Sequence, residues 1–158
     1  MAAQQPDRIV IDGVTLQLYS NPLEEYWIHS AKKRPAFIAH TYCERGYIAT
    51  WEIRNNQLYL IDLEGNFIHR SFLSGKSKLR LSIQTLFSTY TGNGVLAQWF
   101  TGKLRVPIGR MRWYVHEGYE SRFEKEIIIS VTNGSITKRV TLDFANQRLT
   151  NQMLDFQN

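Results

Sequence analysis

Hydrophobic and polar residues alternate along much of this chain, with the period of two that is typical of β-strands. The clearest case is residues 47–54, where every second side chain from Tyr47 to Ile53 is apolar and shares one face. Residues 136–144 alternate in the same way, with Lys138 as the exception on the apolar face. Both segments are therefore predicted to be strands with one face turned towards a core.

Short turn sequences divide these strands into hairpins. Asp12-Gly13, Asn55-Asn56 and Asn133-Gly134 are pairs that readily adopt the positive φ angles of a tight hairpin turn. The strands that we predict around the three turns span residues 8–11 and 14–19, 47–54 and 58–63, and 123–131 and 136–144. The run Ile127–Ile129 has no polar partner positions, which favours a strand covered on both faces.

Two short segments favour helix. Asn21 is a good N-cap, and Pro22 at the first helical position loses no hydrogen bond, so residues 23–28 are predicted to start a short helix. Ser82 is a similar cap for one or two helical turns over residues 82–87.

The middle of the chain is less regular. The strand at residues 58–63 is expected to end at Glu64-Gly65-Asn66. Residues 71–80 carry three basic side chains around Gly75 and are predicted to be a solvated loop. Strands are predicted at residues 95–100 and 103–108. Pro107 cannot donate to a sheet ladder, so the second of these strands should lie at a sheet edge or end there.

These elements define the expected fold class. About seven to nine short antiparallel strands with one or two short helices make a mainly β, or β-dominated α+β, domain, arranged as a sandwich, roll or barrel. We expect a single domain over residues 8–144. A flexible N-terminus at residues 1–7 precedes it, and a partly ordered C-terminal tail at residues 145–158 follows.

Composition agrees with a folded domain and suggests its compartment. The 158 residues are 43% hydrophobic and 13% aromatic, which excludes intrinsic disorder. No apolar run approaches the length of about 18 residues that a membrane span needs, and residues 1–7 do not resemble a signal peptide. Cys43 is the only cysteine, so no internal disulfide forms. We therefore expect a cytoplasmic protein that does not bind membranes. Its net charge of +5 is compatible with an acidic partner.

The usual metal and cofactor motifs are missing from the sequence. His40 and Cys43 are three residues apart, a spacing seen in zinc sites, but no second pair accompanies them. Gly92-Asn93-Gly94 lacks the further glycine and the Lys-Ser/Thr of a phosphate-binding loop. No serine stands in a nucleophile elbow. We predict no metal and no cofactor.

Residues 114–124 are the stretch that most resembles a functional site. Histidine is the only side chain whose unperturbed pKa lies close to physiological pH, and a carboxylate such as that of Glu117 beside His116 could fix its tautomer. Tyr119 and Arg122 add a hydroxyl and a cation. If the protein is an enzyme, His116, Glu117 and Tyr119 are the catalytic candidates. The alternative is a solvated loop that covers one end of a sheet, and if the segment is functional, we favour binding over catalysis.

Basic and aromatic residues alternate just before that segment. Trp99, Arg105, Arg112 and Trp113 belong to this group, and together with His116, Tyr119 and Arg122 they are the predicted binding residues. Arginine beside exposed aromatic rings can hold single-stranded nucleic acid through phosphate contacts and base stacking. The same residue types dominate the energetic centres of protein–protein interfaces. Tryptophans in a β domain are also often core residues, so three interpretations remain open here.

Several phrases of the sequence together resemble a family of uncharacterised bacterial proteins. Its first block is similar to GYIATWEI at residues 46–53 and LYLIDLEG at 58–65. Its second block is similar to WFTGKLRVPIG at 99–109, and its third to YVHEGYESRFEK at 114–125. The resemblance extends roughly over residues 19–140 and implies a compact, stand-alone bacterial domain.

The resemblance carries no established activity, so it assigns no functional residue. It implies that the polar residues His116, Arg105 and Tyr119 are shared with the family. The family more usually has a small or apolar residue at the position of Glu117 and a tyrosine at that of Phe123. A chemical role for a phenol at that last position is therefore not expected in this chain.

The leading hypothesis is a non-enzymatic bacterial domain that binds another protein, for example an immunity or antagonist protein of a toxin system. The first alternative is a module that binds single-stranded nucleic acid through its basic and aromatic strands. The second is a small hydrolase or ligand-binding pocket around His116. The pattern does not determine the oligomeric state, or whether the basic clusters at residues 32–34 and 76–80 share one face.

Overall fold

The computed structural model describes residues 3–73, 75–113, 118–119 and 122–144. These residues form ten strands and two helices, namely β1 (Asp7–Ile11), β2 (Val14–Leu18), α1 (Pro22–His29), β3 (Ala36–Phe37), β4 (Tyr47–Arg54), β5 (Gln57–Ser71), β6 (Gly75–Arg80), α2 (Ile83–Leu86), β7 (Val95–Leu96), β8 (Gly102–Trp113), β9 (Arg122–Thr132) and β10 (Ser135–Asp143). Neither helix of this described part has the length and apolar character needed to cross a membrane.

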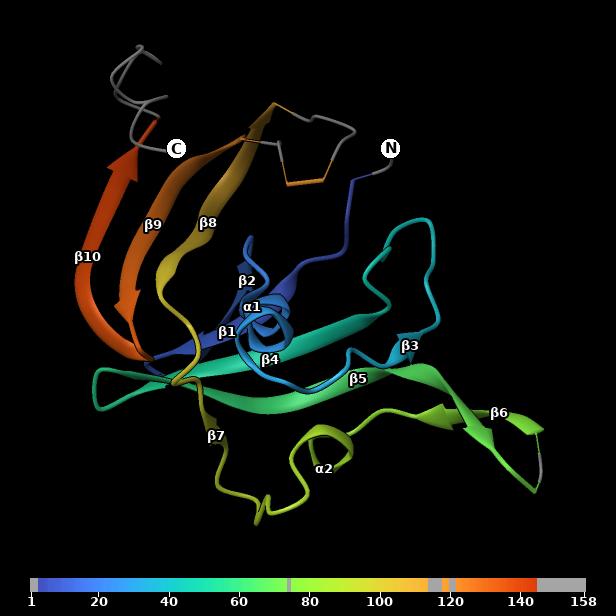
Figure 1. The fold of residues 1–158 in the computed structure, drawn as a ribbon. Helices are drawn as coiled ribbons and strands as arrows, with labels where there is room; N and C mark the ends of the chain where they lie inside the picture. Colours follow the sequence, from blue (N-terminus) through green and yellow to red (C-terminus); the bar gives the residue numbers. More distant parts are fainter. Residues whose placement is uncertain (1–2, 74, 114–117, 120–121, 145–158) are drawn as a thin grey trace.

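All ten strands belong to one mixed sheet with the order β2-β1-β4-β5-β10-β9-β8, and β3, β6 and β7 pair with β5. The pairing of β1 with β4 is parallel, whereas we expected antiparallel strands throughout. β10 meets β5 at a single pair, Ser135 with Gln57, so the sheet bends there and β8 to β10 rise from the plane of β4 and β5 (Figure 1). The predicted β-dominated single domain is confirmed, because all the described strands belong to this one sheet. β2 and β8 at its two ends do not pair, so the sheet is not closed into a barrel.

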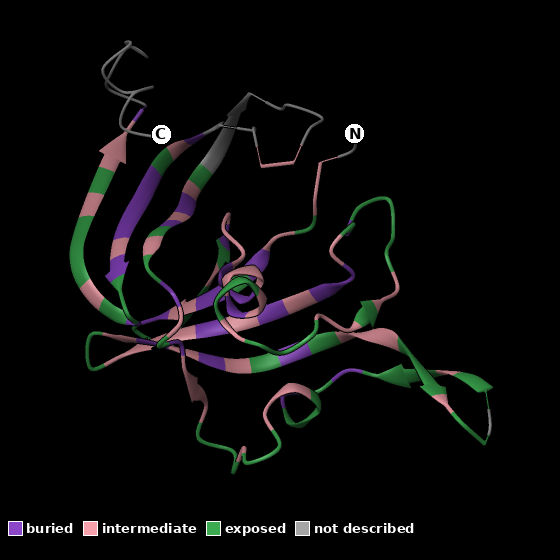
Figure 2. Cartoon of the chain, viewed as in Figure 1, coloured by how far each residue is buried: buried purple, intermediate pink, exposed green. Residues whose placement is uncertain are grey.

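The core lies inside this bend. The alternating side of β4 faces it, and Tyr47, Ala49 and Trp51 are almost completely buried, as the pattern predicts. Leu23 and Tyr26 of α1 are also buried, because the helix lies across the concave side of the sheet (Figure 1). The buried positions follow β4, β8 and β9 in Figure 2, including the whole Ile127–Ile129 run. A strand covered on both faces is thus confirmed for β9.

The turn and helix-start predictions are also confirmed. Each of the three hairpin turns contains residues with positive φ, for example Asn133 at 47° and Gly134 at 82°. α1 begins at Pro22, and α2 begins after Ser82, which forms a reciprocal capping box with Thr85. Asn21 occupies the N-cap position of α1 but makes no side-chain cap. Its amide donates instead to the Tyr119 hydroxyl, 3.1 Å away.

The prediction of a solvated loop at residues 71–80 is wrong. β5 continues to Ser71, and β6 returns antiparallel to it, with Asn66 opposite Arg80 and Ser71 opposite Gly75. This end of the hairpin projects from the body of the domain, and most of its residues are exposed on both faces (Figure 2). A strand without a buried face needs no apolar alternation. The basic sequence of β6 therefore lacks the alternating pattern from which a strand is predicted.

Gly65 explains why β5 does not end where its sequence suggests. Its φ of 145° is unfavourable for other residues, and a Cβ there would lie 2.6 Å from the Gly46 carbonyl oxygen. Gly65 is therefore needed because β5 approaches the start of β4 closely at this position, and not because the chain turns there. Pro107 lies on β8, which is the last strand in the sheet order, as the sequence predicts. Asp7, assigned above to the N-terminal segment, is the first residue of β1.

Candidate functional site

Trp99, a predicted binding residue, is half-buried and packs against the core. Its indole Nε1 donates to the Pro22 carbonyl oxygen at 2.9 Å, which ties the residue to the start of α1. Its ring contacts those of Tyr26 and Phe87, with centroids 5.0 and 5.7 Å away. The stacked contact with Phe87 engages one face of the ring, so Trp99 is held by contacts within the protein.

Arg105 on β8 forms an ion pair with the fully buried Glu126 of β9, and its Nε lies 2.7 Å from Glu126 Oε1. The guanidinium also lies 5.2 Å from the centre of the Tyr19 ring and donates to the Tyr119 carbonyl oxygen. We call Tyr19, Arg105, Tyr119 and Glu126 the Arg105 cluster. Its cation is neutralised within the protein, so it contributes little to an external electrostatic site.

Tyr119 anchors the predicted site segment to this cluster. Its ring stacks on that of Tyr19 with centroids 4.8 Å apart, and burial raises the pKa of its hydroxyl to about 12. Its neighbour Gly118 accepts a backbone hydrogen bond from Gln4 at 3.1 Å.

The other predicted site residues are described less completely. His116 and Glu117 lie outside the described residues. Arg112, Trp113 and Arg122 are placed by their backbones alone, in β8 and at the start of β9, where Trp113 pairs with Arg122. Among the predicted site residues whose side chains are described, Arg105 and Tyr119 are the ones that the structure brings into contact.

A second buried ion pair joins β1 to the segment before β4. Arg45 donates to Asp7 Oδ1 at 2.8 Å, and the Asp7 carboxylate also accepts from the Ala49 backbone N–H at 3.0 Å and from Trp51 Nε1 at 3.2 Å. Burial raises the pKa of Asp7, while the adjacent Arg45 charge opposes that rise. Asp7, Arg45, Ala49 and Trp51 form what we call the Asp7 cluster.

Polar contacts continue from this cluster to the surface at Arg34. The Tyr47 hydroxyl donates to Glu24 at 2.6 Å, and the same carboxylate accepts two hydrogen bonds from Arg34, at 3.2 and 3.3 Å. Arg34 also donates to the Arg45 carbonyl oxygen and lies over the Phe37 ring, 4.7 Å from its centre. Five donor groups on a planar fork make arginine well suited to such fixed, multiple contacts.

Arg34 stands at the wall of a groove of about 630 Å³ between the α1–β3 connection and the outer end of β5 and β6. We call it the basic groove. It is lined by Lys33, Arg34, Pro35, Ala36, Phe67, Ile68, His69, Arg70 and Lys76. The structure thus answers the question that the sequence left open, because basic residues of the 32–34 and 76–80 clusters meet at one surface.

Of the four Lys and Arg side chains that line the basic groove, Arg34 is paired with Glu24, and the other three have no acidic partner among the described residues. No carboxylate lines it, and Lys33, Arg70 and Lys76 form no ion pair with any described residue. Arg70 lies directly opposite Lys76 in the β5–β6 register, and Lys78 and Arg80 follow on the same face of β6. Like charges at directly opposed positions of a sheet destabilise it, so this arrangement favours an external anion.

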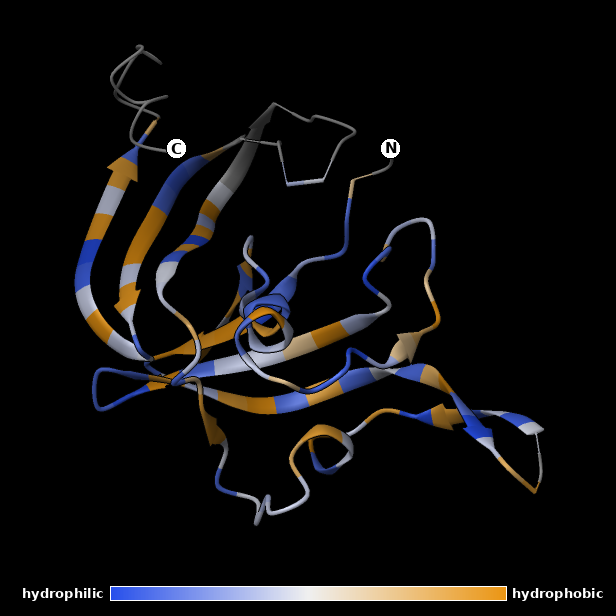
Figure 3. Ribbon diagram, in the orientation of Figure 1, coloured by the Kyte–Doolittle hydropathy of each residue, from blue (hydrophilic) through white to orange (hydrophobic). Residues whose placement is uncertain are grey.

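The hairpin end that forms one side of the groove also exposes apolar residues. We call residues 66–80 the arm. At its tip Phe72 and Leu73 are 103% and 93% exposed, the highest values among the large hydrophobic residues that the structure describes. Figure 3 shows the alternation of hydrophilic and hydrophobic residues along the arm, which ends in this apolar tip. Exposed aromatic and aliphatic side chains beside basic ones are typical of a binding surface.

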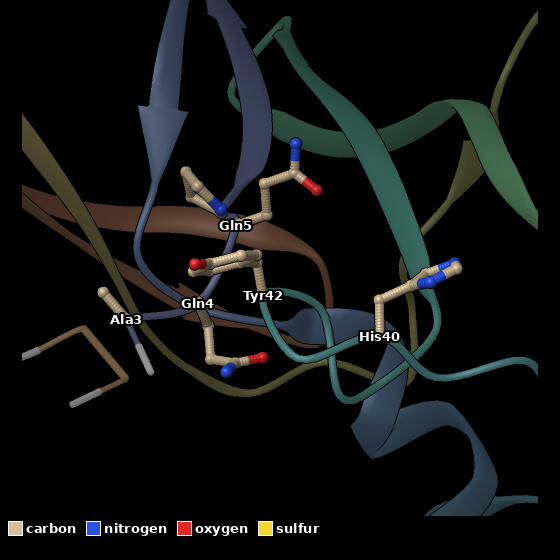
Figure 4. A pocket seen from close by; sticks show the side chains of 6 residues that line it. Ala3, Gln4, Gln5, His40 and Tyr42 are labelled. Atoms are coloured by element: carbon tan, nitrogen blue, oxygen red, sulfur yellow. The ribbon is translucent and has the colours of Figure 1, made fainter. Parts of the chain in front are cut away.

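Two other hollows are less suited to chemistry. One, of about 570 Å³, lies between the N-terminal segment and the β3–β4 connection (Figure 4). The Gln4 side chain bridges the two by bonding the Thr41 carbonyl and the Glu44 N–H, and His40 and Tyr42 are its titratable lining residues. This hollow is a seam between two segments.

A smaller hollow of about 200 Å³ contains His40 and Cys43. These residues pair through their backbones, and the Cys43 thiol donates to the Tyr47 carbonyl oxygen at 3.3 Å. No group of three or more potential metal ligands occurs among the residues that the structure describes.

Sequence reasoning did not identify the basic groove, although one signal was present. The arm sequence NFIHRSFLSGKSKLR contains four Lys and Arg residues and no carboxylate. The missing information was the pairing of β5 with β6, which places those cations on one face. Comparison with known protein families, with curated proteins and with solved structures gives no match for this chain. The resemblance to a bacterial family therefore stays a prediction.

Proposed function

We propose that this chain is a non-enzymatic, cytoplasmic domain that binds another protein, and that the arm and the basic groove are its contact surface. The observation that carries the proposal is the tip of the arm. Phe72 and Leu73 are held almost fully in solvent on a paired strand hairpin, where they contribute nothing to the core. Burying two such side chains in a partner would contribute about 1.5–3 kcal/mol each.

The charges of the groove indicate what kind of protein the partner is. Lys33, Arg70 and Lys76 supply positive potential beside the apolar tip, and the chain as a whole carries +5. A complementary surface on the partner is therefore acidic, with an apolar depression for the tip. Such complementarity mainly accelerates association and rejects wrong partners. An immunity or antagonist protein that blocks the acidic cleft of a toxin is one form of this function.

Binding of single-stranded nucleic acid is the second candidate, because four cations beside one groove also suit phosphates. Of the two tryptophans predicted to bind, Trp99 is held by Pro22, Tyr26 and Phe87, which leaves it less suited to base stacking, and the side chain of Trp113 lies outside the described part of the structure. The arm offers Phe72 at its tip but no row of rings on which successive bases would stack. We therefore place protein binding first.

The test is a tagged pull-down from the organism's own cells, with and without nuclease, followed by mass spectrometry. The bait is the full chain, compared with Phe72→Ser/Leu73→Ser. We expect a stoichiometric partner that survives nuclease and that the double variant loses. A matched control, Val14→Ser/Tyr42→Ser, removes two exposed apolar side chains elsewhere and should retain the partner.

Two outcomes would reject the proposal. A set of many partners that disappears with nuclease would establish nucleic acid as the ligand. A partner held equally by the arm variant and the control would place the contact surface elsewhere on the domain. Circular dichroism of each variant shows that a lost partner does not reflect a lost fold.

A further inference from the structure

The edge of β5 beside the basic groove carries backbone groups that no strand of the described chain covers. Leu81 N–H donates to the Gly65 carbonyl on the β6 side, and Ile38 N–H donates to the Asn66 carbonyl on the β3 side, each at 2.9 Å. Backbone groups of successive strand residues point to opposite sides. Even-numbered residues of this part of β5 therefore present their N–H and C=O groups to the β3 side.

β3 ends before it reaches the end of that edge. Its pairing with β5 stops at Ala36 opposite Ile68, and neither Pro35 nor Arg34 pairs with β5 beyond that point. Arg70 is the next even-numbered residue of β5, and it lies in the lining of the basic groove. Its backbone groups thus face the groove at the place where a further strand would continue the line of β3.

We propose that the basic groove takes an extended, acidic peptide segment of the partner protein, which continues the line of β3 along the free edge of β5 at Arg70. The segment's backbone pairs with Arg70, and its carboxylates lie against the side chains of Lys33, Arg70 and Lys76. Strand addition of this kind draws affinity from backbone hydrogen bonds and specificity from alternate side chains. The inference rests on the proposed function and specifies its ligand.

The surroundings of the edge favour a peptide over nucleic acid. Ala36, Phe67 and Ile68 add apolar side chains to the lining of the groove, which suits the alternating faces of a strand. Arg34 is held by Glu24 and by the Arg45 carbonyl, so this wall of the groove is already in place before a ligand arrives. A preformed wall lowers the entropy that binding must overcome.

The test measures fluorescence anisotropy of the full chain with a labelled Thr-Glu octapeptide of alternating sequence. The comparison probes are the Thr-Gln octapeptide, the Thr-Glu peptide N-methylated at alternate residues, and an eight-nucleotide oligo-dT. We expect the acidic peptide to bind, the glutamine peptide to bind about tenfold or more weakly, and N-methylation to weaken binding about threefold to tenfold through lost backbone bonds.

Matched charge variants locate the binding. Arg70→Glu/Lys76→Glu should weaken the acidic peptide about tenfold or more. Lys138→Glu/Arg139→Glu makes the same charge change on exposed residues of β10, far from the arm in Figure 1, and should change the affinity by less than about threefold. Thermal unfolding of both variants shows that the fold is intact.

Three outcomes would overturn the inference. N-methylation without effect would exclude strand addition, and binding of oligo-dT in preference to the peptide would make the groove a nucleic-acid site. If no peptide binds although Phe72→Ser/Leu73→Ser still abolishes capture of the partner, the partner presents a folded surface. In that last case the proposed function stands and the peptide inference fails, so the two are distinguishable.

Discussion

Two groups of cationic side chains in the described part of this domain have contrasting environments. Arg45 and Arg105 are largely buried, and each reaches a carboxylate, Asp7 or Glu126, whose side chain has no solvent exposure. Arg70, with Lys33 and Lys76, is exposed and forms no ion pair with a described residue. The same charge thus serves the architecture in one region and is available to a ligand in the other.

The difference shows why charge counts alone misplace a functional site. A charge taken from water must be compensated inside the protein, so the buried pairs hold β1, β8 and β9 to their neighbours and have little external field. An exposed cation has no such requirement, and its repulsion from a like charge opposite is a small cost. The first group should therefore control stability, and the second should control binding.

The largest effect should come from Asp7→Ala. The change leaves the Arg45 guanidinium buried without its carboxylate, and it removes the acceptor for the Ala49 N–H and the Trp51 indole. Breaking one side of a buried ion pair typically costs about 3–5 kcal/mol of unfolding free energy. Urea unfolding followed by tryptophan fluorescence measures this loss.

Asp7→Asn serves as the control for that experiment. The amide keeps one acceptor oxygen and the side-chain volume, so the unfolding free energy of Asp7→Asn should lie between those of the wild type and Asp7→Ala. A loss below about 1 kcal/mol for Asp7→Ala would mean that the pair contributes no more than an exposed one, and the division between the two regions would fail.

Tyr47→Phe should have the next largest effect and tests the connection between the regions. It removes the hydroxyl that donates to Glu24 at 2.6 Å, while Glu24 keeps its two bonds from Arg34. A hydrogen bond to a charged group contributes about 1.5–3 kcal/mol, so we expect a loss at the lower end of that range. Urea unfolding gives the value, and acidic-peptide affinity should change by less than about threefold because Arg34 stays in place.

Glu24→Ala completes this comparison. It releases Arg34 from its carboxylate, so the groove loses a fixed wall but also loses the nearest negative charge. Peptide affinity that changes with Tyr47→Phe as strongly as with Glu24→Ala would show that the buried contacts and the groove act as one unit.

Much of the fold could be predicted from local sequence. The turn pairs Asp12-Gly13, Asn55-Asn56 and Asn133-Gly134 require positive φ, and alternation on β4 reports burial directly, so both signals act within a few residues. The parallel contact of β1 with β4 and the bend at Ser135 depend on packing between distant segments, which no local pattern records.

The candidate site was predictable to a smaller extent, for the same reason. Trp99 and Arg105 have the residue types of a binding surface, yet each forms a hydrogen bond within the protein, to Pro22 and Glu126 respectively. These partners are far away in sequence, so a local pattern does not reveal them. The arm shows the opposite case. Its strands have no buried face to reveal them, and its basic face exists only once β5 and β6 pair.

The buried Tyr119 of the Arg105 cluster should make the unfolding free energy decrease at alkaline pH. Burial raises the pKa of Tyr119 from an ordinary 10.0 to about 12, so the folded state keeps a proton that the unfolded chain releases. The resulting stability is fully present below about pH 10 and is lost as the pH rises through about 12. Tyr119→Phe should therefore lose less stability than the wild type between these values.

Urea unfolding of both proteins at several alkaline pH values checks this difference. Burial raises the pKa of Tyr47 in the same direction, so the wild-type slope alone is not specific, and the difference between the two proteins isolates Tyr119. Equal slopes would mean that the Tyr119 hydroxyl is as accessible as a free tyrosine, and the stacking on Tyr19 would not hold it in solution.

The smallest effect on stability should come from the groove itself. Arg70→Ala and Lys76→Ala remove exposed charges that face each other across β5 and β6, so each should change the unfolding free energy by no more than about 0.5 kcal/mol. Relief of the mutual repulsion favours a slight gain over a loss. Each variant should nevertheless weaken the acidic peptide, because it removes a cation without disturbing the fold. A loss of stability comparable to that of Asp7→Ala would instead make these cations part of the architecture, like Arg45, and the contrast between the two regions would disappear.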